Sequence, residues 1–216
     1  MADSNPSGHR SLAHRLLAHL ADVASFDVTP GSEVPPTALT AAQPDRHHQV
    51  IGVRVAVGTG LRALHDLPLP GDPGMTIGWA AVADRCRAAV AAAEPAAHRL
   101  PEPYGRYPMD QLLTMFIDGR PADPDADLVV CHGQPTLDRF LVEGGRFQGL
   151  TGFDSVIVAN RHLDLAVIHQ SVQAVLGPEA VFRLYAAYGQ DPNVALLEHH
   201  ILASHLLGTA PVSAEA

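Results

Sequence analysis

The chain has 216 residues, of which 47% are hydrophobic and 17% charged, and its formal net charge of −9 argues against non-specific nucleic-acid binding, which needs a basic face. All 14 basic residues are arginines, so a mechanism that depends on a lysine ammonium is excluded or must use arginine instead. No apolar run long enough to cross a membrane and no signal-peptide pattern are present, which predicts a cytoplasmic protein without a membrane partner.

The first half of the chain has the pattern of helices separated by proline-rich segments. Leucines at helical spacing predict an amphipathic helix over 11–26, and the prolines of 27–49 predict a linker. The segment 50–67 fits one face of a helix but also carries alternating valines, so helix and strand both stay open there. Alanine-rich and apolar periodicity predict two further helices, over 77–93 and 109–117.

From residue 127 the pattern changes to short apolar runs. These runs predict strands at 128–130, 140–142 and 147–153, and Gly144-Gly145 predicts a hairpin turn between the last two. Helical periodicity then predicts three closing helices, at 161–176, 178–188 and 192–207. The remaining residues, 208–216, are expected to form a flexible tail.

Motifs in this half follow one another in a specific order. A strand leads into Cys131-His132-Gly133-Gln134, the hairpin is followed by Gly152-Phe153-Asp154, and Asn160-Arg161-His162-Leu163-Asp164-Leu165-Ala166 opens a helix. This order resembles the aminoglycoside phosphotransferase family, in the branch that phosphorylates kanamycin-type drugs. The family pattern is H-G-D-x-x-x-x-N, a β-hairpin, an aspartate, and D-R-x-x-D-L-A. Upstream, Leu61-Arg62-Ala63-Leu64-His65 is similar to the family's L-R-x-L-H helix.

The resemblance covers residues 50–207 and implies an α+β fold. It implies an α-rich, protein-kinase-like C-lobe over 50–207 and a truncated N-terminal lobe over 1–49, formed by the short helix and the linker. In the family a strand-rich N-lobe supplies a phosphate loop and a lysine, and neither is expected here. The Gly58-Thr59-Gly60 cluster is weak as a phosphate loop because no convincing strand precedes it.

The departures from the family pattern fall on the residues that carry chemistry. The family's aspartate that orients or deprotonates the attacking hydroxyl is replaced by Gln134, whose amide cannot take a proton. The family's metal-binding asparagine is replaced by Arg139, which would repel Mg²⁺. Asp154 keeps the position of the second metal ligand, so it is the candidate for binding Mg²⁺. Asp138, beside Arg139, is either a displaced base or, more simply, a solvated loop residue.

Other members of the motifs match the family and have structural interpretations. His132 is expected to donate to the backbone near the loop, and Asp164 to brace the loop; Arg161 matches the pattern, while Asn160 replaces an aspartate. The family's drug-binding acidic residues have no carboxylate counterpart in 202–207, although Glu198 could compensate in part.

The cysteines and histidine pairs have simpler interpretations than catalysis or metal binding. Cys86 and Cys131 fit buried thiols of a reducing compartment better than a disulfide. The pairs His47-His48 and His199-His200 lack the companion ligands of a zinc motif, and adjacent helical side chains point about 100° apart.

The leading functional hypothesis is a pseudoenzyme that has lost kinase activity. It would act as a binding or scaffold protein for a protein or small-molecule ligand, or as a homo-oligomer, with no cofactor. The alternative is an active ATP-dependent phosphotransferase on a small-molecule hydroxyl, with Mg²⁺ and ATP or GTP as cofactors. A third hypothesis is a resistance-gene relic without a selected function.

Overall fold

The computed structural model describes residues 47–92, 100, 103–143 and 145–208. The predicted helix at 11–26 and nearly all of the linker lie outside these residues, so the truncated N-terminal lobe stays a prediction. Within the described part, no helix is long and apolar enough to cross a membrane. The main elements, in chain order, are α2 (His47–His65), α3 (Trp79–Ala92), α4 (Met109–Asp118), β1 (Leu128–Cys131), β2 (Phe140–Glu143), β3 (Arg146–Leu150), β4 (Ile157–Asn160), α5 (His162–Leu176), α6 (Pro178–Tyr188) and α7 (Val194–Leu206).

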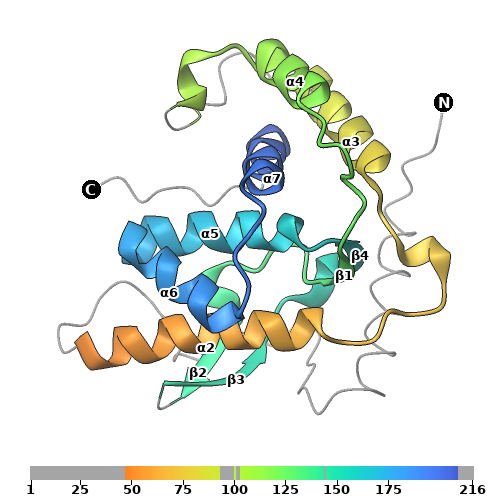
Figure 1. Ribbon diagram of the computed structural model, residues 1–216. Coiled ribbons are helices and arrows are strands. Elements are labelled where there is room, and N and C mark those ends of the chain that lie inside the picture. The colour runs from red at the N-terminus through yellow and green to blue at the C-terminus, as the bar shows by residue number, and fades with distance from the viewer. Residues whose placement is uncertain (1–46, 93–99, 101–102, 144, 209–216) are drawn as a thin grey trace.

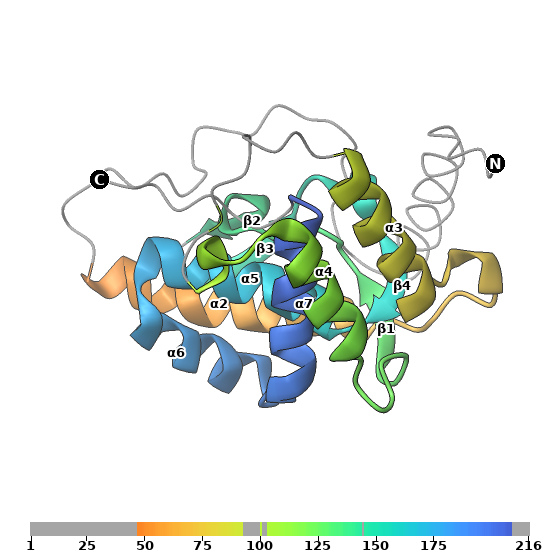
Figure 2. The same cartoon turned by 90° about the horizontal axis from the view of Figure 1, so that it is seen from above.

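The fold is α+β, with the helices arranged in layers around two small sheets. Figure 1 shows the β2–β3 hairpin below α2, with α5 and α6 on its other side. Helix α7 packs on α5, and α3 and α4 cover α7, which is seen from above in Figure 2. One hydrophobic cluster joins α2, β1, β4, α5 and α6, and a second lies between α3, α4 and α7.

Each sheet is a single antiparallel pair. β1 pairs with β4 so that Cys131 lies opposite Ile157, and β2 pairs with β3 across the predicted hairpin, with a register shift between Leu141 and Val142. The β1–β4 register has a direct consequence for the loop that follows β1. It places residues 132–134 beside residues 154–156, although the whole β2–β3 hairpin lies between them along the chain.

The ambiguous segment 50–67 is a helix, because α2 runs from His47 to His65. Gly58-Thr59-Gly60 therefore lies in the middle of α2 and does not form a phosphate loop. A Cβ on Gly58 would lie 2.9 Å from the backbone nitrogen of Tyr188, so the missing side chain lets α2 pack closely on α6.

The three closing helices are confirmed to within two residues at each end, whereas one predicted strand is too long. β3 ends at Leu150, not at 153. Gly152 has a φ of +77°, in the left-handed region, and Phe153–Ser155 forms a 3₁₀ turn. The prediction failed because the apolar run continues through Phe153 while the backbone already turns at the glycine.

Candidate active-site region

The loop that follows β1 is held against the segment before β4. Gly133 has a φ of +89°, and a Cβ at this position would overlap the backbone carbonyl oxygen of Ser155. Because that carbonyl belongs to the main chain, it cannot move aside as a side chain could. Only glycine fits here, and its absence of a side chain fixes the distance between the loop and residues 154–156.

Asp164, in the first turn of α5, braces the loop from below. Its side chain is fully buried, and its carboxylate accepts hydrogen bonds from the backbone nitrogens of His132 at 2.6 Å and Gly133 at 2.8 Å. Charge-assisted bonds of this kind are among the stronger ones in proteins. The expectation that Asp164 braces the loop agrees with this geometry.

His132 connects the loop to the end of the hairpin. Its Nε2 lies 2.8 Å from the carbonyl oxygen of Thr151, which can only accept, so Nε2 carries a proton. Its Nδ1 accepts from the backbone nitrogen of Gln134 at 3.3 Å. Burial lowers the pKa of His132, which favours this neutral form. The side chain therefore bonds to the backbone, as expected for a structural role.

A second layer of buried polar groups lies beneath Asp164. The Nε2 of His65 is 3.2 Å from the Asp164 carboxylate, and its Nδ1 is 2.7 Å from the hydroxyl of Tyr188. Arg161 donates to the Tyr188 hydroxyl at 3.5 Å and to the Gln190 side chain at 2.7 Å. The loop thus rests on a continuous network that reaches α2 and the end of α6.

This layer also contains the single group of potential metal ligands in the described part of the chain, which is His65, Cys131 and Asp164. All three are buried, and Asp164 is already committed to two backbone amides. Burial, followed by the charge of Asp164, raises the pKa of Cys131 well above its usual value. A neutral thiol is a poor metal ligand, so these residues fit a bracing network better than a metal centre.

The substituted positions lie around the same loop but face different directions. Gln134 and the exposed Asp154 line one cavity. Arg139 does not line it and instead packs against Gly152, because a Cβ on Gly152 would overlap the guanidinium, with Cζ only 2.8 Å away. The exposed Asp138 carboxylate lies 3.9 Å from Nε of Arg139. The two predicted metal-ligand positions, 139 and 154, therefore do not open into a common cavity.

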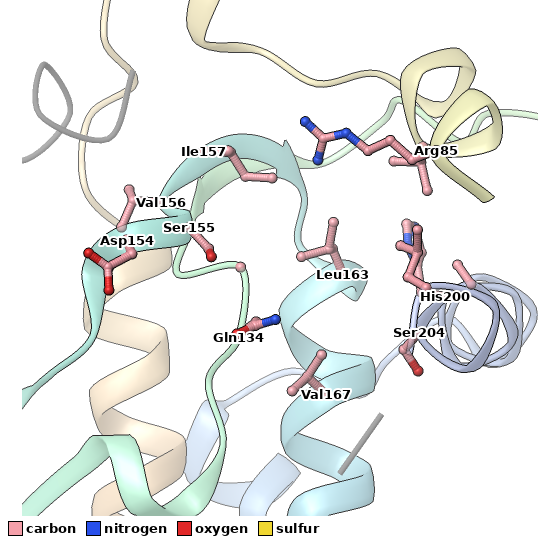
Figure 3. Close-up of a pocket in the computed structure, with 14 residues that line it drawn as sticks. Arg85, Gln134, Asp154, Ser155, Val156, Ile157, Leu163, Val167, His200 and Ser204 are labelled. Atoms are coloured by element: carbon pink, nitrogen blue, oxygen red, sulfur yellow. The ribbon is translucent and has the colours of Figure 1, made fainter. Parts of the chain in front are cut away.

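The cavity has a volume of about 250 Å³ and lies between the loop, α3, α5 and α7 (Figure 3). Ala203, Ser204 and Leu207 from the predicted drug-binding stretch are part of its wall, whereas the exposed Glu198 is not. Its lining residues are Val82, Arg85, Gly133, Gln134, Asp154, Ser155, Val156, Ile157, Leu163, Val167, His200, Ala203, Ser204 and Leu207.

The remaining candidates from the sequence, which are a cysteine nucleophile and two histidine pairs, do not form a catalytic or metal-binding site in the described residues. Cys86 is fully buried, and burial raises its pKa to about 11, so its thiol stays protonated and inert. The rings of His199 and His200 are perpendicular with centroids 6.0 Å apart, and His199 Nε2 accepts from Trp79 Nε1 at 2.8 Å. The two histidines do not chelate together. The side chains of His47 and His48 lie outside the described residues.

A comparison with protein families shows to which family the chain belongs. A model of the phosphotransferase enzyme family matches residues 11–197. The chain belongs to this family. The matched range begins at residue 11, whereas the resemblance identified from the motifs begins at residue 50. An aminoglycoside 3'-phosphotransferase from Streptomyces fradiae is 32% identical over 174 residues, which cover 78% of this chain and 62% of that relative. A second one, from Escherichia coli, is 29% identical over 97 residues, 44% of this chain and 35% of its own length.

Solved structures of the phosphotransferase family share the fold. The crystal structure of aminoglycoside-3'-phosphotransferase of type VIII matches with a TM-score of 0.73 at 24% identity, over 93% of this chain and 81% of that one. An aminoglycoside phosphotransferase from Streptomyces rimosus, in complex with ADP and streptomycin, matches with a TM-score of 0.68 at 19% identity, over 94% and 84% of the two chains. The chain nevertheless spans under two thirds of the length of the curated relatives it matches.

Three residues of the site were missed by the sequence analysis. Arg85 and His200 line the cavity, and Gly152 holds the Arg139 side chain. His200 was considered only as half of a metal pair, and Arg85 lies in an alanine-rich helix that carried no motif. Gly152 was quoted within Gly152-Phe153-Asp154, but its importance depends on a contact with a residue thirteen positions earlier.

Proposed function

We propose that this chain is a ligand-binding member of the phosphotransferase enzyme family that does not transfer phosphate. The observation that carries the proposal is the packing of the Arg139 guanidinium on Gly152. In the resembling family position 139 holds an asparagine that binds Mg²⁺. Here the position holds a permanent positive charge, fitted into space that only a glycine leaves open.

The residues around this position do not fit a magnesium ion. Mg²⁺ demands oxygen ligands in a near-octahedral arrangement, and a guanidinium supplies only donors. Two unit charges of like sign at about 4 Å repel by about 4 kcal/mol at an effective dielectric constant of 20. The carboxylate of Asp138, at 3.9 Å from Arg139 Nε, is exposed and offsets this charge only in part.

Two further features support the loss of transfer. The base position holds Gln134, and loss of general-base help alone lowers rates by about 10²–10⁴-fold. The whole chain contains no lysine to clamp a phosphate. Metal, base and phosphate clamp together account for most of what a protein contributes to phosphoryl transfer.

The preserved scaffold supports a binding role over a relic. Asp164, His132 and Gly133 hold the loop through hydrogen bonds and close packing, and the loop borders the cavity. A drifting sequence has no reason to retain a buried carboxylate, since burying a charge is costly unless its partners are all present. In this proposal the protein is cytoplasmic and its ligand is a small molecule.

Transfer of the γ-phosphate of radiolabelled ATP or GTP tests the proposal directly. We expect the full chain with Mg²⁺ to give no transfer to water, glycerol or kanamycin above a protein-free control. We also expect no Mg²⁺-dependent thermal shift with either nucleotide, whereas a bound ligand at a hundred times its dissociation constant adds about 2.7 kcal/mol.

The opposite result would establish the active phosphotransferase. In that reading Asp154 holds Mg²⁺ and either Asp138 or water acts as base, so transfer would be lost in Asp154→Ala, and also in Asp138→Ala if Asp138 is the base. The matched control is Asp110→Ala, which removes an acidic residue of α4 that does not line the cavity. Transfer that survives both loop substitutions would point to a contaminating kinase.

A further inference from the structure

The cavity beside the 132–134 loop has a permanent positive charge over it. Of the aspartate, glutamate and arginine side chains, those that line it are Arg85 on α3 and Asp154 before β4. Figure 3 shows the Arg85 side chain extending over the cavity, whereas the Asp154 carboxylate points away from it on the far side of the loop. A guanidinium keeps its charge throughout the pH range in which proteins are folded. A ligand in the cavity is therefore exposed to a positive charge more than to a negative one.

The acidic residues nearest to the wall do not bring a carboxylate into the cavity. Asp84 precedes Arg85 in α3, but its exposed carboxylate accepts a hydrogen bond from Arg87 at 2.7 Å and does not line the cavity. Glu198 on α7 is also exposed and outside the wall. The charge of Arg85 therefore remains the main electrostatic feature that the cavity offers to a ligand.

Two departures from the family pattern change the charge of the wall in the same direction. Gln134 stands where the resembling family has an aspartate, and it lines the cavity as a neutral amide. Residues 202–207 stand where the family has the acidic residues of its drug site, and they contribute the uncharged Ala203, Ser204 and Leu207. A carboxylate at either place would attract an ammonium group and repel an anion. The wall therefore lacks the groups that a polycation needs.

The rest of the wall is mostly apolar. The Ser204 hydroxyl donates to the carbonyl oxygen of Ile201 at 2.7 Å and accepts from Gln170 at 2.9 Å, so its hydrogen bonds are made within the protein. A sugar would leave hydroxyls against apolar side chains without hydrogen bonds, which is unfavourable. The apolar part of the wall consists of Val82, Val156, Ile157, Leu163, Val167, Ala203 and Leu207.

We propose that this cavity binds a compact apolar carboxylate, whose anionic group pairs with the guanidinium of Arg85 while its body lies against the apolar wall. Arginine suits a carboxylate because its planar group can donate two parallel hydrogen bonds. The volume of about 250 Å³ lies just below the range of about 300–1,000 Å³ that is common for ligand pockets, so the ligand is small. This inference rests on the proposed function, because it gives the binding protein a class of ligand.

Three probes of the same planar shape and different charge test the head group. Benzoate is an anion, benzamide is neutral, and benzamidine is a cation at pH 7.5. Their binding to the full chain is measured by ligand-observed NMR titration. We expect benzoate to bind at least tenfold more tightly than benzamide, and benzamidine to bind most weakly. Equal binding of benzoate and benzamide, tightest binding of benzamidine, or no binding of benzoate would overturn the proposal.

Acetate separates binding in the cavity from ion pairing at the surface. It carries the same carboxylate as benzoate but lacks the apolar body, so we expect it to bind at least tenfold more weakly. Acetate that binds as tightly as benzoate would mean that Arg85 only attracts anions from solution, and it would overturn the proposal.

Substitutions of Arg85 assign the charge preference to its guanidinium. Arg85→Gln should weaken benzoate at least tenfold and leave benzamide unchanged within twofold. Arg85→Glu should reverse the order, so that benzamidine binds more tightly than benzoate. The matched control is Arg183→Gln, which makes the same change in net charge at an exposed residue of α6 outside the cavity. Because Arg85 is exposed, its variants should fold, and benzoate binding that Arg85→Gln leaves unchanged would overturn the proposal.

A substitution on α7 places the apolar body of the ligand. Leu207 is partly buried in the cavity wall, and Leu207→Trp should fill space there and weaken benzoate and benzamide alike, at least tenfold. The control is Val194→Trp, at a 63% exposed residue at the start of the same helix and outside the cavity. Both variants are first compared with the parent by thermal unfolding. Benzoate that binds a folded Leu207→Trp protein with unchanged affinity would lie outside the cavity, which would contradict the proposal.

The outcome is independent of the phosphate-transfer assay. None of the probes contains phosphate, and none needs Mg²⁺. Transfer activity would contradict the proposed function even if benzoate binds. A missing preference for benzoate would contradict the ligand class while leaving the absence of transfer intact.

Discussion

The loop at residues 132–134 has a buried side and a cavity side, and the two differ in what they have kept. On the buried side, Asp164, His132, His65 and Tyr188 form a connected network with bonds of 2.6 to 3.2 Å. On the other side, Gln134 lines the cavity and Arg139 packs on Gly152, and these two positions hold a base and a metal ligand in the resembling family. The comparison teaches that the loop conformation depends on one set of atoms and the residues at the family's base and metal positions form another, so the first can stay in place while the second differ.

Acid should lower the free energy of unfolding through the buried histidines far more than through exposed groups. This is the largest effect we expect. Burial lowers the pKa of His162 and His199 to about 4 and that of His200 to about 3. Unfolded histidines titrate near 6.5, so the unfolded chain binds more protons below this pH. The stability from these groups is present above pH 6.5 and lost as pH falls toward 4.

Each of these histidines contributes a slope of up to about 1.4 kcal/mol per pH unit within that window. Urea denaturation at pH 7.5, 6.0 and 5.0 measures the slope. We expect the free energy of unfolding to fall by several kcal/mol between the first and the last pH. His200→Phe should reduce the slope by about 1.4 kcal/mol per pH unit, which corresponds to one proton. A free energy of unfolding that does not change down to pH 5 would show that these rings are solvated.

The two aspartates of the site give the sharpest single-residue contrast. Asp164→Ala leaves the backbone amides of His132 and Gly133 buried without an acceptor, at a cost of about 1–3 kcal/mol for each group. We expect a total loss of about 3–5 kcal/mol. Asp154→Ala removes an exposed carboxylate and should change stability by less than about 0.5 kcal/mol. Chemical denaturation of both variants at pH 7.5 provides the comparison, and equal losses would contradict it.

Gly133 and Gly152, two glycines of the site with a positive φ, differ in whether the atom that an added Cβ would meet can move aside. An alanine at Gly133 would collide with the backbone of Ser155, and one at Gly152 with the end of the Arg139 side chain. We expect Gly133→Ala to cost about 3 kcal/mol and Gly152→Ala about 1–2 kcal/mol. Arg139→Ala should relieve part of the second cost but none of the first, which a double-mutant cycle with thermal unfolding can measure.

Sequence reasoning succeeded where structure is local. Helix α6 was placed correctly because Pro178 suits a first helical turn and Gly189, at a φ of +79°, suits a helix end. The segment 50–67 stayed ambiguous because its glycines have low helix propensity, and only packing against α6 decides in favour of α2.

The candidate site was predicted in part for the same reason. His132, Gln134, Arg139 and Asp164 lie in one motif order and were identified from it. The direction of Arg139 toward Gly152 was not predictable, because it depends on how the hairpin folds back on the loop. The place of His200 in the cavity wall also depends on contacts between α7, α5 and α3 that no local pattern encodes.

The smallest effect we expect comes from the outer edge of the buried network, at Tyr188. Tyr188→Phe removes the hydroxyl that lies 2.7 Å from His65 Nδ1 and keeps the ring, which is only 1% exposed. The histidine nitrogen then has no partner at this position, and we expect a loss of about 1–2 kcal/mol in urea denaturation. Tyr107→Phe, at a side chain that is 37% exposed, is the control and should change stability by less than about 0.5 kcal/mol. A loss as large as that of Asp164→Ala would mean that the network holds the loop as one unit. No loss would mean that the stabilising part of the network ends at His65 and does not include the Tyr188 hydroxyl.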